Sequence, residues 1–199
     1  MTDAAAAKRP IGLAVTLIVT AVIGFSAAFA LTVEKFHLLL NPDAALGCDI
    51  SPLVQCKANL ESWQGSLFGF PNPLIGLAAW SMVLVVAVAL LAGARFDRWF
   101  WIVFNLGTAA ALALVVFLII TSIFFLGTLC PWCMVTWVVT IPTFLIVTLH
   151  NLRSGTIPLP ARGRAFAAAA YSWIPIISLG LYLVVVVIAQ LQLDVLGSI

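Results

Sequence analysis

The chain has 199 residues, of which 64% are hydrophobic and only 8% are charged, and its formal net charge is +2 at pH 7. Ordinary soluble domains carry about 25% charged residues, so the composition excludes a soluble domain, and the small net charge gives no reason to expect a nucleic-acid partner. We therefore interpret residues 1–199 as a single membrane domain of an all-α integral membrane protein.

Five segments are apolar for long enough to form transmembrane helices, which require about 20 residues each. The longest uncharged run, residues 99–149, has room for two spans. We place the turn between them at residues 127–129, because Gly127 favours a turn and Pro131 cannot continue a helix. Pro142 should kink the second of these spans, since it frees the carbonyl of Val138. The expected spans are residues 11–33, 74–94, 99–122, 131–149 and 171–193, with a loop at residues 150–164.

The first apolar segment has an alternative interpretation as a cleaved secretory signal, with Ala28-Phe29-Ala30 as an A-x-A cleavage site. Its apolar stretch is longer than the 7–15 residues of a typical signal core. We therefore expect this segment to be a retained span, with the chain emerging on the far side of the membrane at Glu34.

The basic residues predict the orientation. Cytoplasmic loops of membrane proteins carry an excess of Lys and Arg, and the five spans divide these residues unequally between the two sides. Only Lys35 and Lys57 fall on one side, which we expect to be extracytoplasmic. The opposite side holds Lys8, Arg9, Arg95, Arg98, Arg153, Arg162 and Arg164. This distribution predicts a protein of the cell (inner or plasma) membrane with a cytoplasmic N-terminus, and with all four cysteines and the C-terminus outside.

Residues 34–71 form the one long polar segment, and it contains Cys48 and Cys56. Ser51 as N-cap and Pro52 as first helical residue predict a short helix over residues 52–60. Its apolar residues recur at helical spacing, so we expect this helix to lie on the membrane surface. Cys56 would then be on the helix and Cys48 in a flexible lead-in.

The sequence Cys-Pro-Trp-Cys at residues 130–133 opens the fourth span, because Pro is favoured at the first position of a helix. Cys130 and Cys133 are three residues apart and so share one helix face. The amides and the dipole at a helix N-terminus stabilise a thiolate and lower the pKa of a cysteine. The spacing therefore predicts a redox-active pair at the extracytoplasmic membrane face.

Two structural roles for the cysteines compete with redox chemistry. Disulfides Cys48–Cys56 and Cys130–Cys133 could brace the loop, but such short loops gain little stability from closure, and strained, exposed disulfides are the labile ones. A zinc site usually takes Cys-x₂₋₄-Cys pairs in both halves, which the wider first pair does not match, so we expect no metal site. We favour a dithiol relay in which Cys56 attacks Cys130 and releases Cys133, and the electrons pass to a membrane quinone.

Four polar or aromatic side chains are candidates for a quinone pocket. Trp137 lies four residues after Cys133, on the same helix face, and its indole N–H is a donor. Asn72 offers an amide at the mouth of the second span, and Ser62 and Trp63 are placed to close the pocket from above. The alternatives are that the tryptophans are interface anchors and that Asn72, between two prolines, is a turn residue.

At these residues the chain resembles the vitamin K epoxide reductase family, over about residues 11–149. The motifs are Cys-Asp-x₆-Cys at 48–56, Ser-Trp at 62–63, Phe-Pro-Asn-Pro-Leu-Ile-Gly at 70–76 and Cys-Pro-Trp-Cys at 130–133. The cysteine order distinguishes it from DsbB-type quinone reductases, whose Cys-x-x-Cys precedes the wider pair. The resemblance implies a four-helix bundle around a quinone of the menaquinone or ubiquinone type, to which this chain adds a fifth transmembrane helix.

The resemblance also implies residue roles. Cys48 would meet the protein partner, Cys56 would attack Cys130, and Cys133 would react with the quinone, while Ser62 and Asn72 match family positions implicated in quinone contact. Trp137 departs from animal members, which have a tyrosine there. Several bacterial relatives carry a thioredoxin-like domain after the fifth span, so for this chain we expect a separate DsbA-like partner.

The predicted function is therefore a membrane oxidoreductase that generates disulfide bonds and reoxidises an extracytoplasmic thioredoxin-like protein. One alternative within the same chemistry is a quinone or quinone-epoxide reductase whose product is the hydroquinone. A third reading, from a different class, is a disulfide-braced membrane scaffold without redox turnover.

Overall fold

The computed structural model describes residues 10–194 and residue 197. This part of the chain is helical apart from its connections and holds no strand, only one isolated β-bridge. The α-helices are α1 (Ile11–Leu40), α2 (Lys57–Glu61), α3 (Asn72–Ala92), α4 (Arg98–Ile120), α5 (Pro131–Ser154), α6 (Ala161–Ser172) and α7 (Ile174–Leu193). Two further turns are the 3₁₀-helix η1 (Trp63–Ser66) and the π-helix η2 (Thr121–Leu126).

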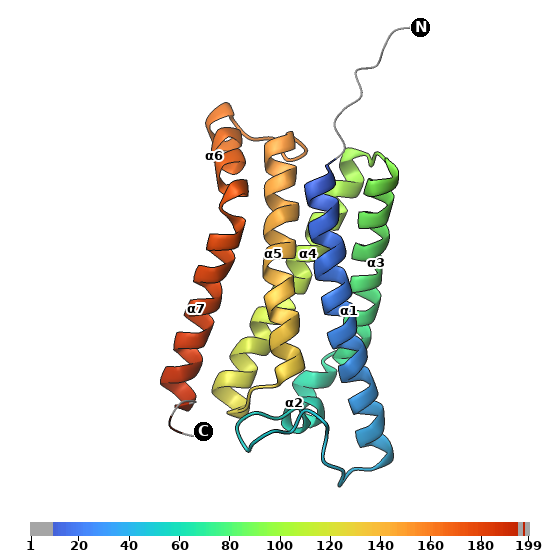
Figure 1. The fold of residues 1–199 in the computed structure, drawn as a ribbon, viewed down its shortest axis with the longest axis vertical. Coiled ribbons are helices and arrows are strands. Elements are labelled where there is room, and N and C mark those ends of the chain that lie inside the picture. Colours follow the sequence, from blue (N-terminus) through green and yellow to red (C-terminus); the bar gives the residue numbers. More distant parts are fainter. Residues whose placement is uncertain (1–9, 195–196, 198–199) are drawn as a thin grey trace, which may run out of the picture.

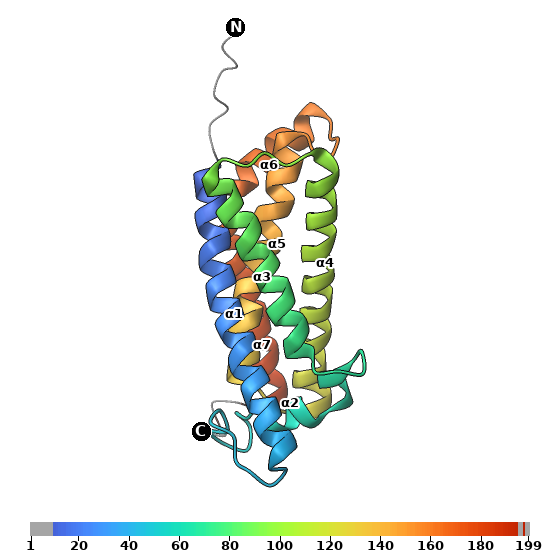
Figure 2. The same cartoon turned by 90° about the vertical axis from the view of Figure 1, so that its right-hand side faces the viewer.

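Helices α1, α3, α4 and α5 form a four-helix bundle, and α7 lies beside α5 at its edge (Figure 1). Helix α1 packs against both α3 and α5, and α4 packs against α5. The loop that carries α2 lies at one end of the bundle, and α6 lies at the opposite end (Figure 2). Five helices in the described part are long and apolar enough to cross a membrane, with α4 continued by η2. The chain is thus an all-α membrane protein, as predicted.

The contact between α1 and α3 depends on small residues, because lipid supplies no hydrophobic force between helices and close packing must replace it. Ala14, Ala21 and Ala28 on α1 are buried, and a Cβ atom added at Gly76 of α3 would lie only 3.0 Å from the Cβ atom of Ala28. Gly24 lies against the indole ring of Trp80, so close that a Cβ atom there would be 2.2 Å from Cε2 of the ring. The absence of a side chain at Gly24 therefore allows α3 to approach.

The predicted turn before the fourth span is confirmed. Gly127 has a φ of +64°, a left-handed conformation that favours glycine. Cys130 is the N-cap of α5 and Pro131 is its first residue. Helix α4 does not stop at Ser122 as expected but continues as η2 to Leu126, one turn closer to Gly127.

Several boundaries differ from the prediction, and two helices continue beyond the apolar runs. Helix α3 is shifted by two residues, from the expected 74–94 to Asn72–Ala92. Helix α1 does not end at residue 33 but extends to Leu40, since its last turns lie over the loop, where Leu38 is buried. Helix α5 continues to Ser154 and ends at Gly155, which has a φ of +79°. The segment expected to be a loop contains the start of α6, and the fifth span begins only at Ile174.

The predicted helix over residues 52–60 is wrong in its first half. Residues 53–55 instead bond outside a helix: the Leu53 carbonyl accepts from the N–H of Leu129, and the N–H of Gln55 donates to the Leu129 carbonyl. The Ser51 hydroxyl accepts from the N–H of Val54 in a local turn. Helix α2 begins only at Lys57, with Cys56 as its N-cap residue. A tertiary backbone pairing therefore overrides the capping signal of Ser51 and Pro52.

Pro142 lies inside α5, as predicted, and the carbonyl that it leaves without an N–H donor accepts a hydrogen bond from another helix. The hydroxyl of Tyr182 on α7 donates to the oxygen of Val138 at 2.5 Å. A carbonyl left without a donor is costly in a membrane. The proline thus creates an acceptor on α5, and α7 attaches to it.

We predict that Gly24→Ala destabilises the protein, because the added methyl group must displace the buried Trp80 ring. Overpacking of this kind costs about 1–3 kcal/mol, measured as thermal unfolding of the purified protein in detergent. Gly180→Ala on α7 is the matched control, since a Cβ atom there meets nothing within 4 Å. Equal stability of the two variants would contradict the prediction.

Candidate active site

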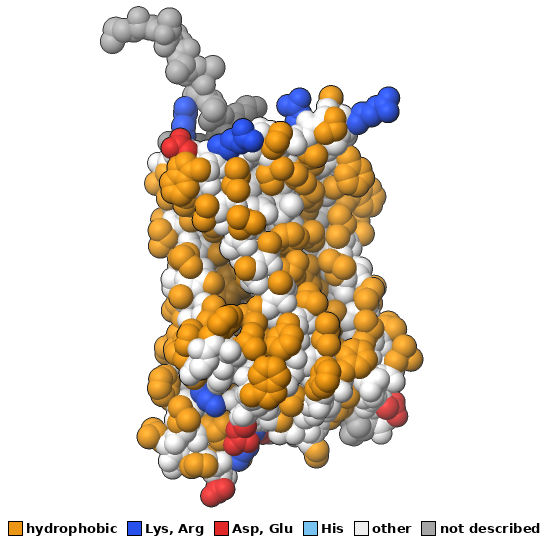
Figure 3. Space-filling view, turned by 180° about the vertical axis from the view of Figure 1, so that it is seen from behind, with side chains coloured by type: hydrophobic (Ala, Val, Ile, Leu, Met, Phe, Trp, Pro, Cys, Tyr) orange, Lys and Arg blue, Asp and Glu red, His pale blue; other side chains and the backbone are white. Residues whose placement is uncertain are grey.

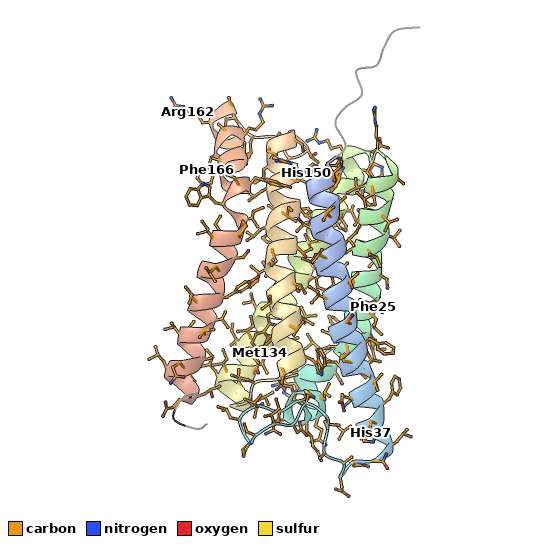
Figure 4. All side chains as sticks on the ribbon, viewed as in Figure 1. Phe25, His37, Met134, His150, Arg162 and Phe166 are labelled. Atoms are coloured by element: carbon orange, nitrogen blue, oxygen red, sulfur yellow. A yellow bond between two sulfur atoms is a disulfide. The ribbon has the colours of Figure 1, made fainter. Side chains whose placement is uncertain are left out.

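The four cysteines lie together at the loop end of the bundle. Cys48 and Cys56 form a disulfide, and Cys130 and Cys133 are free thiols. The Sγ atom of Cys130 lies 3.4 Å from that of Cys56. In Figure 4 the label of Met134, which follows Cys133 in α5, marks this end, whereas His150 marks the other end of the same helix. Within residues 10–194 and 197, no group of three or more His, Cys, Asp or Glu side chains is arranged to hold a metal ion.

The loop disulfide is not in a flexible lead-in, as expected for Cys48, but is buried. Cys48 is 5% exposed, and Cys56 and Cys130 are fully buried. Leu31 and Leu38 of α1, with Leu46 and Leu60 of the loop, pack around the three sulfur atoms. The extension of α1 beyond the predicted span supplies part of this cover.

A short backbone pairing sets the distance between Cys56 and Cys130. The N–H of Leu129 donates to the oxygen of Leu53 at 2.8 Å, and the N–H of Gln55 donates to the oxygen of Leu129 at 3.0 Å. These bonds form a parallel bridge between Val54 and Leu129. Each of the two cysteines immediately follows a paired residue, so the register of the bridge places their sulfur atoms in contact.

Polar contacts around Thr128 fix the other side of this bridge. Asn59 of α2 donates to the Thr128 hydroxyl at 3.1 Å. The Ser122 hydroxyl, in the π-helix η2, donates to the Thr128 carbonyl, and the Thr128 N–H donates back to the carbonyl of Ser122 at 3.2 Å. π-Helical turns often occur at functional sites. Here η2 positions the segment that leads into Cys130.

The environment of Cys130 favours its thiolate. Cys130 lies just before the span, where the N–H of Cys133 points to its Sγ atom at 3.4 Å. The hydrogen bond from the Cys133 side chain lowers the pKa of Cys130, and backbone N–H groups add to this effect, whereas burial opposes it. Cys130 is therefore a better leaving group than an ordinary cysteine.

A cavity of about 660 Å³ lies next to this site, within the range of small-molecule pockets. Residues of α3, α4 and α5 form most of its wall, and η1 covers its end. Cys133 and Trp137 both line it, together with Thr136 and Thr140 from the same helix. The cavity is apolar apart from a few such side chains, which suits a lipophilic ligand with polar ring substituents.

Trp137 presents an unused donor at this cavity. Its side chain is 5% exposed, and its indole Nε1 is buried without a hydrogen-bond partner among the described residues. A buried N–H group without a hydrogen-bond partner costs free energy. A ligand in the cavity that accepts a hydrogen bond from the Trp137 N–H would remove this cost.

Of the other three candidate residues, Asn72 and Ser62 line the cavity and Trp63 does not. Asn72 lines the cavity, but its Nδ2 donates to the Gln64 carbonyl at 2.6 Å and its Oδ1 accepts from the Leu67 N–H at 3.1 Å. Ser62 also lines it and caps η1 by accepting from the Gly65 N–H. Trp63 is not part of the cavity wall, because its ring is 68% exposed and lies near Phe117.

The cavity opens sideways toward the surface that would face lipid. Val85 of α3 and Val103 of α4 line the cavity and are also exposed. Helix α3 packs mainly on α1 and α4 mainly on α5, which leaves little contact between α3 and α4. The surface of this side is mostly apolar and is hollowed near mid-height (Figure 3).

A family model described as "Vitamin K epoxide reductase family" matches residues 15–148, more than half of the chain. The chain belongs to the vitamin K epoxide reductase family. No curated protein matches the chain. Members of the vitamin K epoxide reductase family are quinone-linked membrane oxidoreductases, and membership makes this chain a membrane oxidoreductase. The matched region contains all four cysteines, α3 and α4 entirely, and α1 and α5 except for their ends at residues 11–14 and 149–154, with α7 beyond it.

Sequence analysis did not identify the residues that position the sulfur atoms. Leu129 and Asn59 act through contacts with distant parts of the chain, and Ser122 acts through bonds to Thr128 across the turn; neither kind of contact leaves a periodic pattern in the sequence. The one usable signal was Gly127, which marked the turn from which Thr128 and Leu129 follow.

We predict that a protein with Cys48→Ser and Cys133→Ser forms a Cys56–Cys130 disulfide rapidly under mild oxidation, because these sulfur atoms are already in contact. Peptide mapping under non-reducing conditions measures the cross-link. The control with Cys48→Ser and Cys130→Ser leaves Cys133, one turn deeper in α5, and should react more slowly. Equal rates would mean that the 3.4 Å contact does not determine the exchange partner.

Proposed function

We propose that this protein generates disulfide bonds: it oxidises an extracytoplasmic thioredoxin-like protein through Cys48 and Cys56 and passes the electrons through Cys130 and Cys133 to a membrane quinone. The observation that carries the proposal is the 3.4 Å contact between Cys56 and Cys130, next to a cavity lined by Cys133. These positions connect a polar loop to an apolar cavity through sulfur atoms alone.

The relay follows from thiol–disulfide exchange. The Cys56 thiolate attacks Cys130 of a Cys130–Cys133 disulfide, and Cys133 leaves as a thiolate. Cys48 then attacks Cys56, and Cys130 leaves, which its lowered pKa favours. The products are a Cys48–Cys56 disulfide and two thiols in α5, the arrangement that the structure has.

The cavity would hold the quinone ring beside Cys133, and a bound quinone supplies a two-electron acceptor of menaquinone or ubiquinone type. We assign the Trp137 N–H as a donor to a ring oxygen, because this donor is buried and otherwise unpaired. Asn72 has a second amide hydrogen that can serve the same purpose. Ser62 and Trp63 then act through the cover formed by η1, where Ser62 is the cap and Trp63 rests near Phe117.

We further propose that the loop and all four cysteines are extracytoplasmic. Arginine side chains gather at the end of the bundle opposite the loop (Figure 3), which supports this orientation by the positive-inside rule. The residues concerned are Arg95, Arg98, Arg153, Arg162 and Arg164. A topology reporter inserted between α3 and α4 should therefore show that this connection lies on the cytoplasmic side. An extracytoplasmic location of this reporter would contradict the proposed orientation.

The function is tested in the purified full-length protein by measuring donor oxidation and quinone reduction in the same reaction. A reduced thioredoxin-like donor and a short-chain quinone should be converted together, one donor disulfide for each quinone reduced. Cys133→Ser should abolish quinone reduction. A protein that exchanges disulfides without quinone reduction would be a different kind of thiol exchanger, and one that does neither would be a scaffold. Reduction of a quinone epoxide would favour the alternative product.

Trp137→Phe separates hydrogen bonding from packing, because it keeps the aromatic ring and removes the N–H donor. We expect slower quinone reduction with unchanged exchange between the donor and the loop cysteines. Removing a donor aimed at developing charge costs up to about 10²–10³ in rate. Val138→Ala, on the next position of α5 and exposed at 48%, is the control. A wild-type rate in Trp137→Phe, with thiol exchange not limiting, would remove Trp137 from the quinone site.

A further inference from the structure

The carboxylate of Asp49 spans the same two segments of the loop that the Cys48–Cys56 disulfide joins. Before Cys48, the N–H of Leu46 donates to its Oδ2 atom at 3.1 Å. After the loop, the N–H groups of Cys56 and Lys57 donate to its Oδ1 atom at 2.8 and 3.3 Å. Hydrogen bonds to a charged acceptor are among the stronger ones in proteins. The disulfide and the carboxylate thus both join these segments, beside the backbone bonds from the N–H groups of Ile50 and Ser51 to the Val54 carbonyl within the loop.

These two closures differ in their response to redox chemistry. The disulfide must break in every cycle of the proposed function, whereas no electron transfer changes the Asp49 carboxylate. We propose that Asp49 is a positioning residue that keeps the loop closed when the Cys48–Cys56 bond is broken, so that Cys48 stays beside Cys56. The inference rests on the proposed function, because only a relay breaks and re-forms this bond repeatedly.

The step that needs this closure is the second exchange of the relay. After the first exchange, Cys56 is bonded to Cys130 and Cys48 is a free thiol that loses its proton. The Cys48 thiolate then attacks the Sγ atom of Cys56: the Cys48–Cys56 bond forms and the Cys56–Cys130 bond breaks. Cys130 leaves with the electron pair and takes up a proton. The loop pair has lost two electrons and the α5 pair has gained two, with no other reactant.

The rate and equilibrium of this step depend on the effective concentration of Cys48 at Cys56. The two cysteines are eight residues apart, and a short flexible linker gives effective concentrations in the millimolar range. A loop held in its closed conformation gives higher values, because the entropy of closure has been lost in advance. Asp49 supplies such a conformation through hydrogen bonds on both sides of the loop.

Two other side chains, those of Glu34 and Lys35, bond to the loop from α1. Glu34 of α1 accepts from the N–H of Gly47 at 3.2 Å, and Lys35 donates to the carbonyl of Leu60 at 2.7 Å. Each of these contacts ties one point of the loop to α1 and does not join the two cysteine segments. Glu34 therefore offers a matched control carboxylate in the same region.

The test is the redox equilibrium of the loop pair with glutathione, in the full-length protein with Cys130→Ser and Cys133→Ser. Asp49→Asn replaces one acceptor oxygen with an NH₂ donor, so one side of the contact is lost. We expect the equilibrium constant for forming the Cys48–Cys56 disulfide to fall by roughly tenfold, a shift of about 30 mV for a two-electron couple. Glu34→Gln should leave it unchanged. An unchanged constant in Asp49→Asn, or an equal fall in Glu34→Gln, would overturn the proposal.

A second measurement does not depend on folding of the variant. In the reduced protein that retains Asp49, the amide hydrogens of Cys56 and Lys57 should exchange slowly with solvent, because the carboxylate still accepts from them. Fast exchange of both amides on reduction would show that the carboxylate does not hold them once the disulfide is broken, and it would overturn the proposal. Neither measurement contains quinone or a protein partner, so failure here and failure of the proposed function are distinguishable.

Discussion

The structure of the active site depends on the pairing of Leu129 with the backbone on either side of Val54. Two hydrogen bonds, of 2.8 and 3.0 Å, hold a loop that follows α1 against the lead-in of α5. Every other contact between the two cysteine pairs builds on this register, including the sulfur contact of 3.4 Å. Backbone hydrogen bonds in a buried setting are costly to break without replacement. The pairing therefore fixes the two sulfur atoms more firmly than a contact between side chains would.

The bundle contributes the second half of the site by leaving space. Helix α1 packs closely on α3 through Gly24 and Trp80, whereas α3 and α4 make little contact. The resulting cavity is bordered by Trp137 and Cys133 on one face of α5, and it is continuous with the apolar outer surface. The site thus combines a tightly held polar loop with a loosely packed apolar interior, which is the combination that the proposed transfer from protein thiols to a membrane quinone requires.

Much of this arrangement could be predicted from the sequence where the signal is local. The apolar runs, Gly127 and Pro131 were enough to locate the five spans and to place Cys130 at the start of a helix. The spacing of Trp137 from Cys133 correctly put both on the wall of one cavity, although the role of Trp137 stays a prediction. The bridge at Val54 could not be predicted, since it joins residues 75 positions apart with no repeated pattern. For the same reason the capping signal at Ser51 was misleading, and the burial of Cys48 under Leu38 was missed.

The burial of Cys48 has a consequence for selectivity among thiols. A sulfur atom in a residue that is 5% exposed can be attacked from solvent only during the fraction of time in which its cover opens. The observed rate for any attacking thiol is then the intrinsic rate multiplied by that fraction. A small thiol that does not bind the loop leaves the fraction of time in which the cover is open unchanged. A protein that bound the open loop would raise this fraction by its own affinity, so the cover would slow small-molecule thiols more than the protein partner that we propose.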